Sequence, residues 1–291
     1  MNFAIVTVRG PEYHPNRRLL EAANSRGHRA KLIDPYRSWP AVIGNFPGFR
    51  GEPVSVDVLL PRQGAEIGES SLTLIEQAEQ SGVTVVNGPA AIRLAADKFR
   101  TARALAAAGI PVPDAVLANT PDAATAAAAA VGGCPAVVKP VSGRQGEGVY
   151  LAADEDSLQR HLAAAGDLRR GLVVQRFIPP VGRRDLRILV LGQRIAGASA
   201  LRPNEGDFRS NFHLTGAAEP VKPEEEIGSL AVSAVRTLGL QIAGVDLVID
   251  DRGRPWVMEV NYAPGFRGLE AATGIDIAGA MVEYLERFRQ R

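Results

Sequence analysis

Three side chains that could bind a metal ion lie on two apolar segments near the C-terminus. Asp246 is the one acid in Ala243–Ile249, and Glu259 and Asn261 lie at the end of Trp256–Asn261. The Asp-Asp-Arg-Gly turn between the segments predicts a hairpin. Glu259 and Asn261 are two residues apart and share a face, on which Asp246 can lie opposite them. Such oxygen ligands suit magnesium, especially magnesium carried by nucleotide phosphates. The alternative is that Asp246 pairs with a buried arginine.

A second candidate site is a glycine-rich loop that follows an apolar strand ending in Lys139-Pro140. The loop contains Ser142, Gly143, Gly146 and Gly148, and a further strand leaves it. Glycines let backbone amides approach an anion, and a lysine supplies a point charge to phosphate. The loop lacks Gly-Lys-Ser/Thr and is followed by a strand, so it is neither a P-loop nor a dinucleotide fingerprint. It is typical of a flap over phosphates, with a plain hairpin loop as the alternative.

Composition indicates an ordinary globular chain. It has 291 residues, 46% hydrophobic residues and a net charge of +1, so nucleic acid is not expected as the main ligand. A single cysteine, Cys134, excludes an intramolecular disulfide and a cysteine zinc cluster. The first residues predict a strand rather than a signal peptide, and no long apolar run predicts a membrane span. We therefore expect a cytoplasmic protein that does not interact with membranes.

The elements that must position these residues follow a strand–helix–strand order in the first third of the chain. This order predicts a parallel sheet covered by helices, in a first domain of residues 1–95. The expected strands are Phe3–Val8, Ala30–Ile33, Val56–Leu60 and Val83–Val86, and the helices are Asn16–Arg26 and Ser70–Gln80.

Further along, one helix is expected from Ala90 to Ala108 and an alanine-rich helix over Asp122–Val131. The remaining expected elements are strands at Leu172–Ile178 and Ile188–Leu191, and helices at Glu224–Leu238 and Gly279–Arg289.

Taken in order, short motifs along nearly the whole chain resemble the ATP-grasp ligases, and within them the RimK-like alpha-L-glutamate ligases. The motifs are Ala96-Asp97-Lys98, Val138-Lys139-Pro140, the glycine loop, Gln175-Arg176-Phe177-Ile178, Asp185-Leu186-Arg187, Gly206-Asp207-Phe208-Arg209-Ser210-Asn211, Ala243-Gly244-Val245-Asp246, Met258-Glu259-Val260-Asn261 and the closing string from Gly268 to Gly279.

This resemblance implies a fold of class α/β plus α+β, with an N-terminal parallel-sheet domain followed by a two-lobed ATP-grasp unit. The lobes are expected at 96–177 and 178–291. It also implies an ADP-producing ligase that forms an amide through an acyl phosphate. The expected reaction adds L-glutamate to a protein or peptide C-terminus, and a homo-oligomer is expected. The alternatives are a LysX-like ligase acting on a small metabolite or carrier protein, and a non-catalytic ATP-binding sensor.

The resemblance also implies roles for individual residues, with ATP and two Mg²⁺ or Mn²⁺ ions as cofactors. Lys139, Arg209 and Asn211 are the implied catalytic residues. The implied ATP-binding residues are Lys98, Lys139, Ser142, Gly143 and Gly146, with Arg176 and Phe177 at the adenine, Asp185 at the ribose, and Arg209, Ser210 and Asn211 beside the phosphates and the reacting carboxylate. The implied metal ligands are Asp246, Glu259 and Asn261.

The chain departs from the pattern of this group at three places. Arg176 stands where an acid is usual, Tyr262-Ala263 replaces Ala-Ser, and Pro203-Asn204 replaces a more basic stretch. Tyr262 is bulky and follows the expected metal ligands. These departures are expected to affect the acceptor more than the chemistry.

Overall fold

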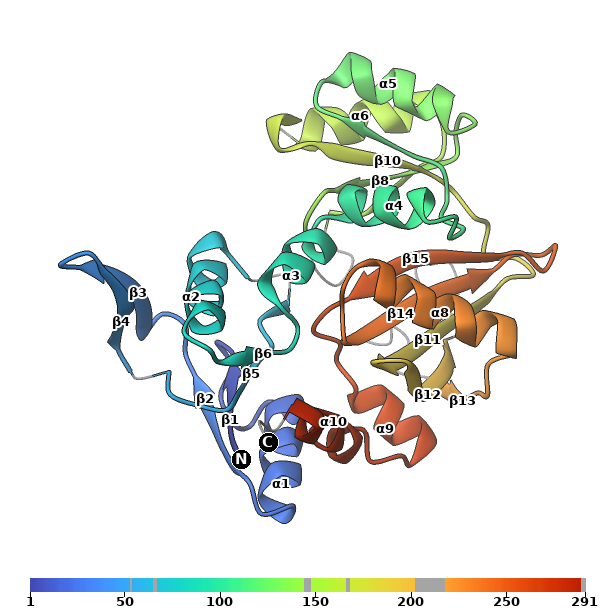
Figure 1. The fold of residues 1–291 in the computed structure, drawn as a ribbon. Coiled ribbons are helices and arrows are strands. Elements are labelled where there is room, and N and C mark those ends of the chain that lie inside the picture. Colours follow the sequence, from blue (N-terminus) through green and yellow to red (C-terminus); the bar gives the residue numbers. More distant parts are fainter. Residues whose placement is uncertain (53, 65–66, 144–147, 166–167, 202–217, 289–291) are drawn as a thin grey trace.

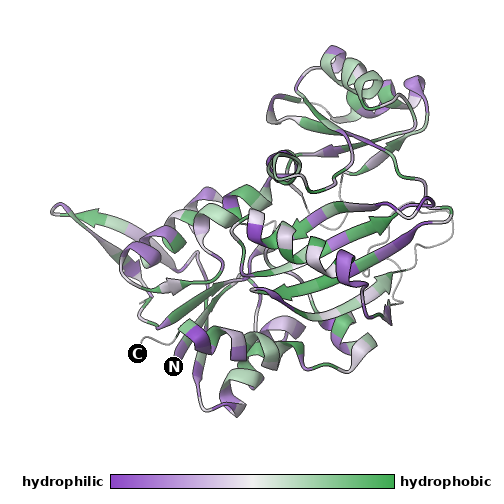
Figure 2. Ribbon diagram, turned by 45° about the vertical axis from the view of Figure 1, so that its right-hand side comes forward, coloured by the Kyte–Doolittle hydropathy of each residue, from purple (hydrophilic) through white to green (hydrophobic). Residues whose placement is uncertain are grey.

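Three sheets built from successive parts of the chain form the framework of the computed structural model (Figure 1). The structure describes residues 1–52, 54–64, 67–143, 148–165, 168–201 and 218–288. Figure 2 shows hydrophobic residues concentrated on the strands and on the helix faces that cover them. The expected mixture of a parallel-sheet domain and further α+β parts is confirmed. No helix in the described ranges is long and apolar enough to cross a bilayer.

The first sheet is parallel and has the strand order β2-β1-β5-β6. Its apolar strands are short and almost wholly buried at β1 and β5, as expected for a sheet with elements on both faces. The elements are β1 (Asn2–Val6), α1 (His14–Ser25), β2 (Arg29–Ile33), β5 (Val58–Pro61), α2 (Glu69–Gln80) and β6 (Thr84–Val85).

A two-stranded hairpin between β2 and β5 was not expected from the sequence. It consists of β3 (Ser38–Ile43) and β4 (Phe46–Gly51), paired from Ile43 opposite Phe46. The turn is Gly44-Asn45, and Asn45 has a φ of 68°. A Gly-Asn pair between apolar runs is a hairpin signal, so the information was present locally.

The single helix expected over Ala90–Ala108 is wrong, because the chain breaks it into two. These are α3 (Pro89–Ala96) and α4 (Lys98–Ala107), and Asp97 between them has an extended backbone. The Asp97 carboxylate accepts a hydrogen bond from the Arg100 backbone N–H at 2.8 Å. An aspartate that caps a new helix satisfies an otherwise free N–H, so the break is locally favourable. It places Lys98 at the first turn of α4.

The second sheet is antiparallel, with the order β7-β10-β8-β9, and two helices pack on it. The predicted strand–glycine loop–strand arrangement is confirmed by the pairing of β8 with β9. The elements are β7 (Ala115–Ala118), α5 (Pro121–Ala130), β8 (Ala136–Pro140), β9 (Tyr150–Ala152), α6 (Glu155–Ala165), a 3-10 turn at Leu168–Arg170 and β10 (Leu172–Arg176).

The third sheet has the order β13-β12-β11-β14-β15, and its neighbours are antiparallel. A buried core joins β11 and β14 to α8 and to residues of α3 and α4. The elements are β11 (Arg184–Leu191), β12 (Arg194–Leu201), β13 (Ala218–Pro220), α8 (Glu225–Thr237), β14 (Ile242–Ile249) and β15 (Pro255–Asn261).

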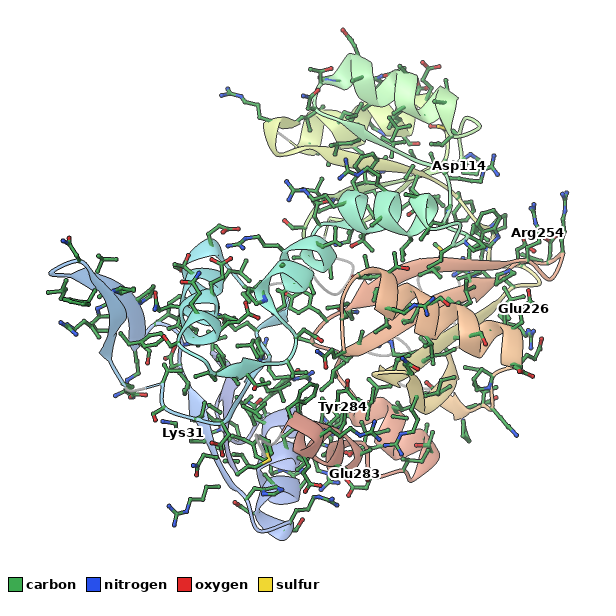
Figure 3. The ribbon with its side chains drawn as sticks, in the orientation of Figure 1. Lys31, Asp114, Glu226, Arg254, Glu283 and Tyr284 are labelled. Carbon is green, nitrogen blue, oxygen red and sulfur yellow. The ribbon has the colours of Figure 1, made fainter. Side chains whose placement is uncertain are left out.

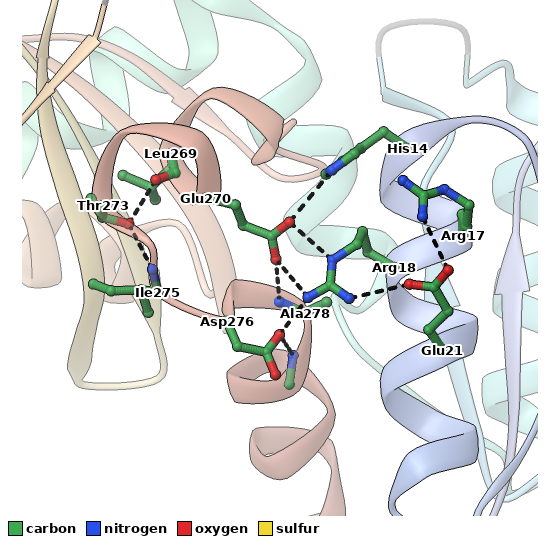
Figure 4. A network of polar contacts seen from close by, with 11 residues as sticks. His14, Arg17, Arg18, Glu21, Leu269, Glu270, Thr273, Ile275, Asp276 and Ala278 are labelled. Carbon is green, nitrogen blue, oxygen red and sulfur yellow. Dashed lines mark hydrogen bonds and ion pairs between the residues drawn. The ribbon is translucent and has the colours of Figure 1, made fainter.

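The last helices return to the first sheet. These are α9 (Arg267–Thr273) and α10 (Ile277–Leu285), with a 3-10 turn at Glu286–Phe288, and α10 lies against α1 (Figure 1). Arg18 of α1 donates to Glu270 (3.2 Å) and Asp276 (2.9 Å) (Figure 4). One apolar cluster contains Phe3, Leu19, Val58, Phe266, Ile277 and Met281. The two ends of the chain therefore share a core, and the limits 1–95, 96–177 and 178–291 stay a proposed division.

Candidate active site

The hairpin predicted near the C-terminus is present as β14 and β15. Asp246 lies directly opposite Glu259, and Gly244 opposite Asn261. The register shifts by one residue just after Asp246, so β15 carries a bulge at that point. Glu259 and Asn261 share one face because side chains alternate along a strand. The structure therefore brings the three expected metal ligands together on two adjacent strands.

Asp246 has a partner that the sequence reasoning considered only as the alternative. Arg187, opposite it on β11, donates to both carboxylate oxygens of Asp246, with Nε–Oδ1 at 2.7 Å and Nη2–Oδ2 at 2.6 Å. The pKa of Arg187 is raised, first by the charge of Asp246 and further by that of Glu259. Arg187 thus pairs with Asp246 and offsets one of the two carboxylate charges on this face, which leaves a net negative charge.

The donor set at this place fits a hard divalent cation. Among the described residues, the side chains of Glu259 and Asn261 make no hydrogen bond, and both line a pocket. No group of three or more His, Cys, Asp or Glu in the described ranges is placed to hold a metal ion. Besides the carboxylates of Asp246 and Glu259, an ion here would therefore need the amide oxygen of Asn261 and oxygen atoms of a bound ligand. Magnesium and manganese accept such mixed oxygen coordination.

Two lysines line the same pocket from the side opposite Glu259 and Asn261. Lys98 donates from Nζ to the Gly143 carbonyl at 3.2 Å, and its backbone N–H donates to Val141 at 2.8 Å. Lys139 lies on β8, and burial lowers the pKa of its ammonium to about 8, while Glu259 raises the pKa and Lys98 lowers it. Among the described residues, no carboxylate forms an ion pair with Lys139. Its charge is therefore available to an anionic ligand.

The pocket lies between the second and third sheets and has a volume of about 680 Å³, part of it open to solvent. It combines two cations, a carboxylate and two amides with an apolar lining, which is the usual make-up of a small-molecule site. The lining residues are Ala95, Ala96, Lys98, Thr101, Ala102, Leu105, Val112, Ala115, Lys139, Gly143, Val173, Gln175, Val257, Met258, Glu259, Val260, Asn261 and Tyr262.

The glycine loop begins at the pocket wall. Gly143 lines the pocket, and Ser142 beside it is exposed. Gly148, where the described chain resumes, has a φ of 69°, and a Cβ there would lie 3.3 Å from Pro140. Glycine is therefore required at that end of the loop. Gly146 lies outside the described residues, as do Arg209, Ser210 and Asn211.

Arg176, Phe177 and Asp185, three of the expected ATP-binding positions, do not line the pocket. The carboxylate of Asp185 is buried and accepts from Arg183 at both oxygens, at 2.7 and 2.9 Å. Arg176, the last residue of β10, is paired at 2.9 Å with Asp114, which directly precedes β7 and is labelled in Figure 3. The Arg176 backbone N–H is also bonded to the Asp114 carbonyl, at 2.8 Å. Phe177, next along the chain, is half-buried and does not line the pocket.

Sequence reasoning gave no role to three residues of the site, although it named Tyr262 as a bulky residue next to the expected metal ligands. Arg187 was part of a quoted motif but was given no role. Gln175 is buried at the pocket wall, and a polar residue in the run Leu-Val-Val-Gln was a signal for it. Tyr262 lines the pocket, and its hydroxyl donates to the Gly64 carbonyl. That contact joins the pocket to the first sheet, and no local pattern predicts it.

Comparisons with known proteins cover almost the whole chain. A RimK PreATP-grasp domain model matches residues 1–92, and a RimK-like ATP-grasp domain model matches residues 95–285. A probable alpha-L-glutamate ligase of Teredinibacter turnerae is 39% identical over 290 residues, which are 99% of this chain and 96% of that protein.

Two solved structures have the same fold. A RimK domain ATP-grasp protein from Sphaerobacter thermophilus matches with a TM-score of 0.74 and 27% identity, covering 98% of this chain and 100% of that one. The ATP-grasp ligase PsnB, in complex with a minimal precursor, Mg and ADP, matches with a TM-score of 0.74 and 21% identity, covering 99% and 97%. At that identity the second likeness concerns the fold alone.

Proposed function

Because the chain belongs to the RimK-like ATP-grasp family of ATP-dependent ligases, we propose that it joins L-glutamate to a carboxylate of a protein or peptide C-terminus. The observation that carries this proposal is that the two lysines and the expected metal ligands of β15 line one pocket. Lys98 and Lys139 line it from one side, and Glu259 and Asn261 line it from β15. The alpha-L-glutamate ligase names of relatives such as the Teredinibacter protein support glutamate as the amine.

The reaction requires activation of the carboxylate. One carboxylate oxygen attacks the γ-phosphorus of ATP, the bond to the β–γ bridging oxygen breaks, and ADP leaves. The amine then attacks the carbonyl carbon of the acyl phosphate through a tetrahedral intermediate. Inorganic phosphate leaves with the bonding electrons, the nitrogen loses a proton, and an amide remains. The first step brings a carboxylate toward the negative phosphates, and the second develops an oxyanion beside the acyl phosphate, so both need fixed positive charge.

The residues of the pocket supply that charge. Lys98 and Lys139 would bind phosphate oxygens, and the burial that lowers the pKa of Lys139 to about 8 also strengthens its field, since a partly desolvated charge is screened less. Arg187 holds Asp246 in one orientation through two hydrogen bonds. Asp246, Glu259 and Asn261 would hold the divalent ions, two in number, which neutralise phosphate charge when bound.

Water must be kept away while the acyl phosphate exists. We assign this role to the loop of residues 142–148, of which Gly143 borders the pocket. Arg209, Ser210 and Asn211 remain proposed for the phosphates and the reacting carboxylate. Asp185 is left out of the proposed ribose site, because Arg183 already engages both of its oxygens.

The function is tested by incubating the protein with ATP, Mg²⁺, a cell lysate and each amino acid in turn. We expect ADP release with L-glutamate and a protein whose mass increases by one or more glutamate residues. A mass increase confined to small molecules would instead identify a metabolite ligase. ADP release with no ligated product in any mixture would refute ligation.

The acyl phosphate has its own test. With the acceptor and ATP present, hydroxylamine in place of the amino acid should yield a hydroxamate and ADP, because the carboxylate is activated before the amine enters. AMP and pyrophosphate as the main nucleotide products would contradict the mechanism.

A further inference from the structure

Unpaired polar atoms gather at one place outside the pocket. Across the described residues, the buried side-chain nitrogen and oxygen atoms without a hydrogen-bond partner all belong to four residues. They are Nδ1 of His14, Oδ1 of Asn16, Nε and Nη1 of Arg62, and both amide atoms of Gln63. Buried polar groups are normally paired, so a cluster of unpaired ones calls for a missing partner.

These residues lie at the carboxyl ends of two neighbouring parallel strands. Arg62 directly follows β5, and its backbone N–H donates to the Val6 carbonyl at the end of β1, at 2.8 Å. His14 and Asn16 are in the first turn of α1, which follows β1. From β1 the chain continues to β2 on one side, whereas from β5 it continues to β6 on the other. Open parallel sheets bind ligands in the crevice at such a reversal of strand order.

Arg62 is the charged member of the cluster and has no counter-ion among the described residues. Its residue is 9% exposed, and its guanidinium makes one hydrogen bond, from Nη2 to the Pro264 carbonyl at 2.6 Å. Burial lowers its pKa to about 10, so it stays charged at neutral pH. By contrast, Arg183 and Arg187, whose side chains are 6% and 18% exposed, each bind both oxygens of an aspartate. Burying a cation without such a partner is unfavourable.

The cluster is connected to the pocket through a short segment that follows the expected metal ligands. The Arg62 guanidinium contacts Pro264 and lies 5.8 Å from the ring centre of Phe266. Tyr262, in the same segment, lines the pocket and donates to the Gly64 carbonyl. The segment of residues 262–266 therefore contacts the pocket at one end and Arg62 at the other.

We propose that Arg62, with Gln63 beside it, binds a carboxylate of the substrate that is not the one being activated. The proposal rests on the ligase function proposed above. The planar fork of a guanidinium matches the two oxygens of a carboxylate, and the free amide of Gln63 can donate to the same group. The carboxylate belongs either to the incoming amino acid or to the acceptor peptide, and the chemistry of recognition is the same in both cases.

The test measures binding to the full-length protein by calorimetry, with a non-hydrolysable ATP analogue and Mg²⁺ present. The probes are L-glutamate, a glutamate-ended peptide with a free C-terminal carboxylate, and the same peptide amidated at its C-terminus. In Arg62→Met, we expect the affinity for L-glutamate or for the free peptide to fall about a hundredfold. A fall for glutamate assigns the amino acid as the source, and a fall for the free peptide alone assigns the acceptor. Arg62→Lys should recover part of the affinity, and the affinity for the ATP analogue should be unchanged.

Two further variants separate binding from folding. Gln63→Leu keeps the charge of Arg62 and should weaken the same probe by about tenfold. Arg93→Met is the matched control, because Arg93 lies in the same part of the chain but is paired with Glu69 and Glu76; it should leave every affinity unchanged. In the ligand-free protein, Arg62→Met should not lower the melting temperature, because it removes an unpaired buried charge.

The proposal is overturned if no probe binds the wild type, or if Arg62→Met and Gln63→Leu bind all probes as the wild type does. It is equally overturned if Arg62→Met loses the ATP analogue, or if it lowers the melting temperature without changing any affinity. These readings do not depend on turnover. Loss of the proposed function would show as absent ligation, whereas failure of this inference would leave ligation intact with an unchanged KM for both substrates in Arg62→Met.

Discussion

Replacing Lys139 with methionine should stabilise the ligand-free protein while abolishing nucleotide binding. Burial lowers the pKa of Lys139 from 10.5 to about 8, so its ammonium is less favourable in the folded state than in the unfolded chain. At about 1.4 kcal/mol per pH unit, this difference corresponds to about 3 kcal/mol at pH 7. Since the residue is half-buried, solvent screens part of the effect, and we expect about 1–3 kcal/mol.

The pH dependence gives the sign of this effect. Below pH 8 the ammonium is charged in both states, and the full penalty is present. Between pH 8 and 10.5 the folded protein releases the proton and the unfolded chain keeps it, so the contribution of Lys139 to stability rises with pH. The advantage of Lys139→Met over the wild type should therefore shrink between pH 7 and about pH 10.

The measurement is urea unfolding of both proteins at the two pH values, without nucleotide. Other titrating groups cancel in the difference between the two proteins. Lys222→Met, at an exposed position, serves as the control and should show no such pH-dependent difference. A Lys139→Met protein that is less stable than the wild type at pH 7, or whose advantage is the same at both pH values, would refute the reasoning. Added ATP should raise the melting temperature of the wild type and not that of the variant.

Three further changes test individual residues. Glu259→Gln keeps the size of the side chain but removes the charge of a metal ligand, so ADP release should be almost lost while the melting temperature is unchanged. Full activity of this variant at an ordinary Mg²⁺ concentration would refute the assignment of Glu259 as a metal ligand. Arg176→Glu breaks an exposed ion pair with Asp114 that is worth at most about 1 kcal/mol, so the Kd for ATP should change less than about fivefold. A thousandfold loss of turnover would show that Arg176 has a direct role in the reaction. Asp185→Asn leaves Arg183 buried without its counter-ion and should cost about 3 kcal/mol of stability in urea, with the Kd for ATP little changed; weakened ATP binding at unchanged stability would instead restore the ribose role.

Local patterns in the sequence determined most of the framework. The two apolar segments and the turn residues between them predicted the β14–β15 hairpin, in which Asp246 lies opposite Glu259. The strand–helix–strand order predicted the first parallel sheet, and the strand on each side of the glycine loop predicted the β8–β9 pair. These features depend on residues close in sequence, whose periodicity is set by the geometry of each element.

Other local signals were present but competed with stronger ones. The helical pattern over Ala90–Ala108 hid the break at Asp97, where one capping hydrogen bond outweighs helix continuity. The pairing of Arg183 with Asp185 joins side chains two residues apart, and it is our reason for leaving Asp185 out of the proposed ribose site. Whether an acid serves a ligand or a neighbouring arginine depends on burial, which the sequence pattern alone does not specify.

Only the tertiary structure decided which distant groups meet. Arg187 and Asp246 are 59 residues apart, and Arg62 and Pro264 are 202 residues apart. The first contact arises because β11 and β14 are neighbours in a sheet, and the second because the segment after β15 packs on the carboxyl ends of the first sheet. The sequence by itself determined the elements and the types of charge in the pocket. The partner of each charge was decided by packing, because only the assembled sheets exclude water. Packing gives Arg187 an aspartate partner within the protein, whereas at Arg62 we propose that the partner is an anion of the substrate.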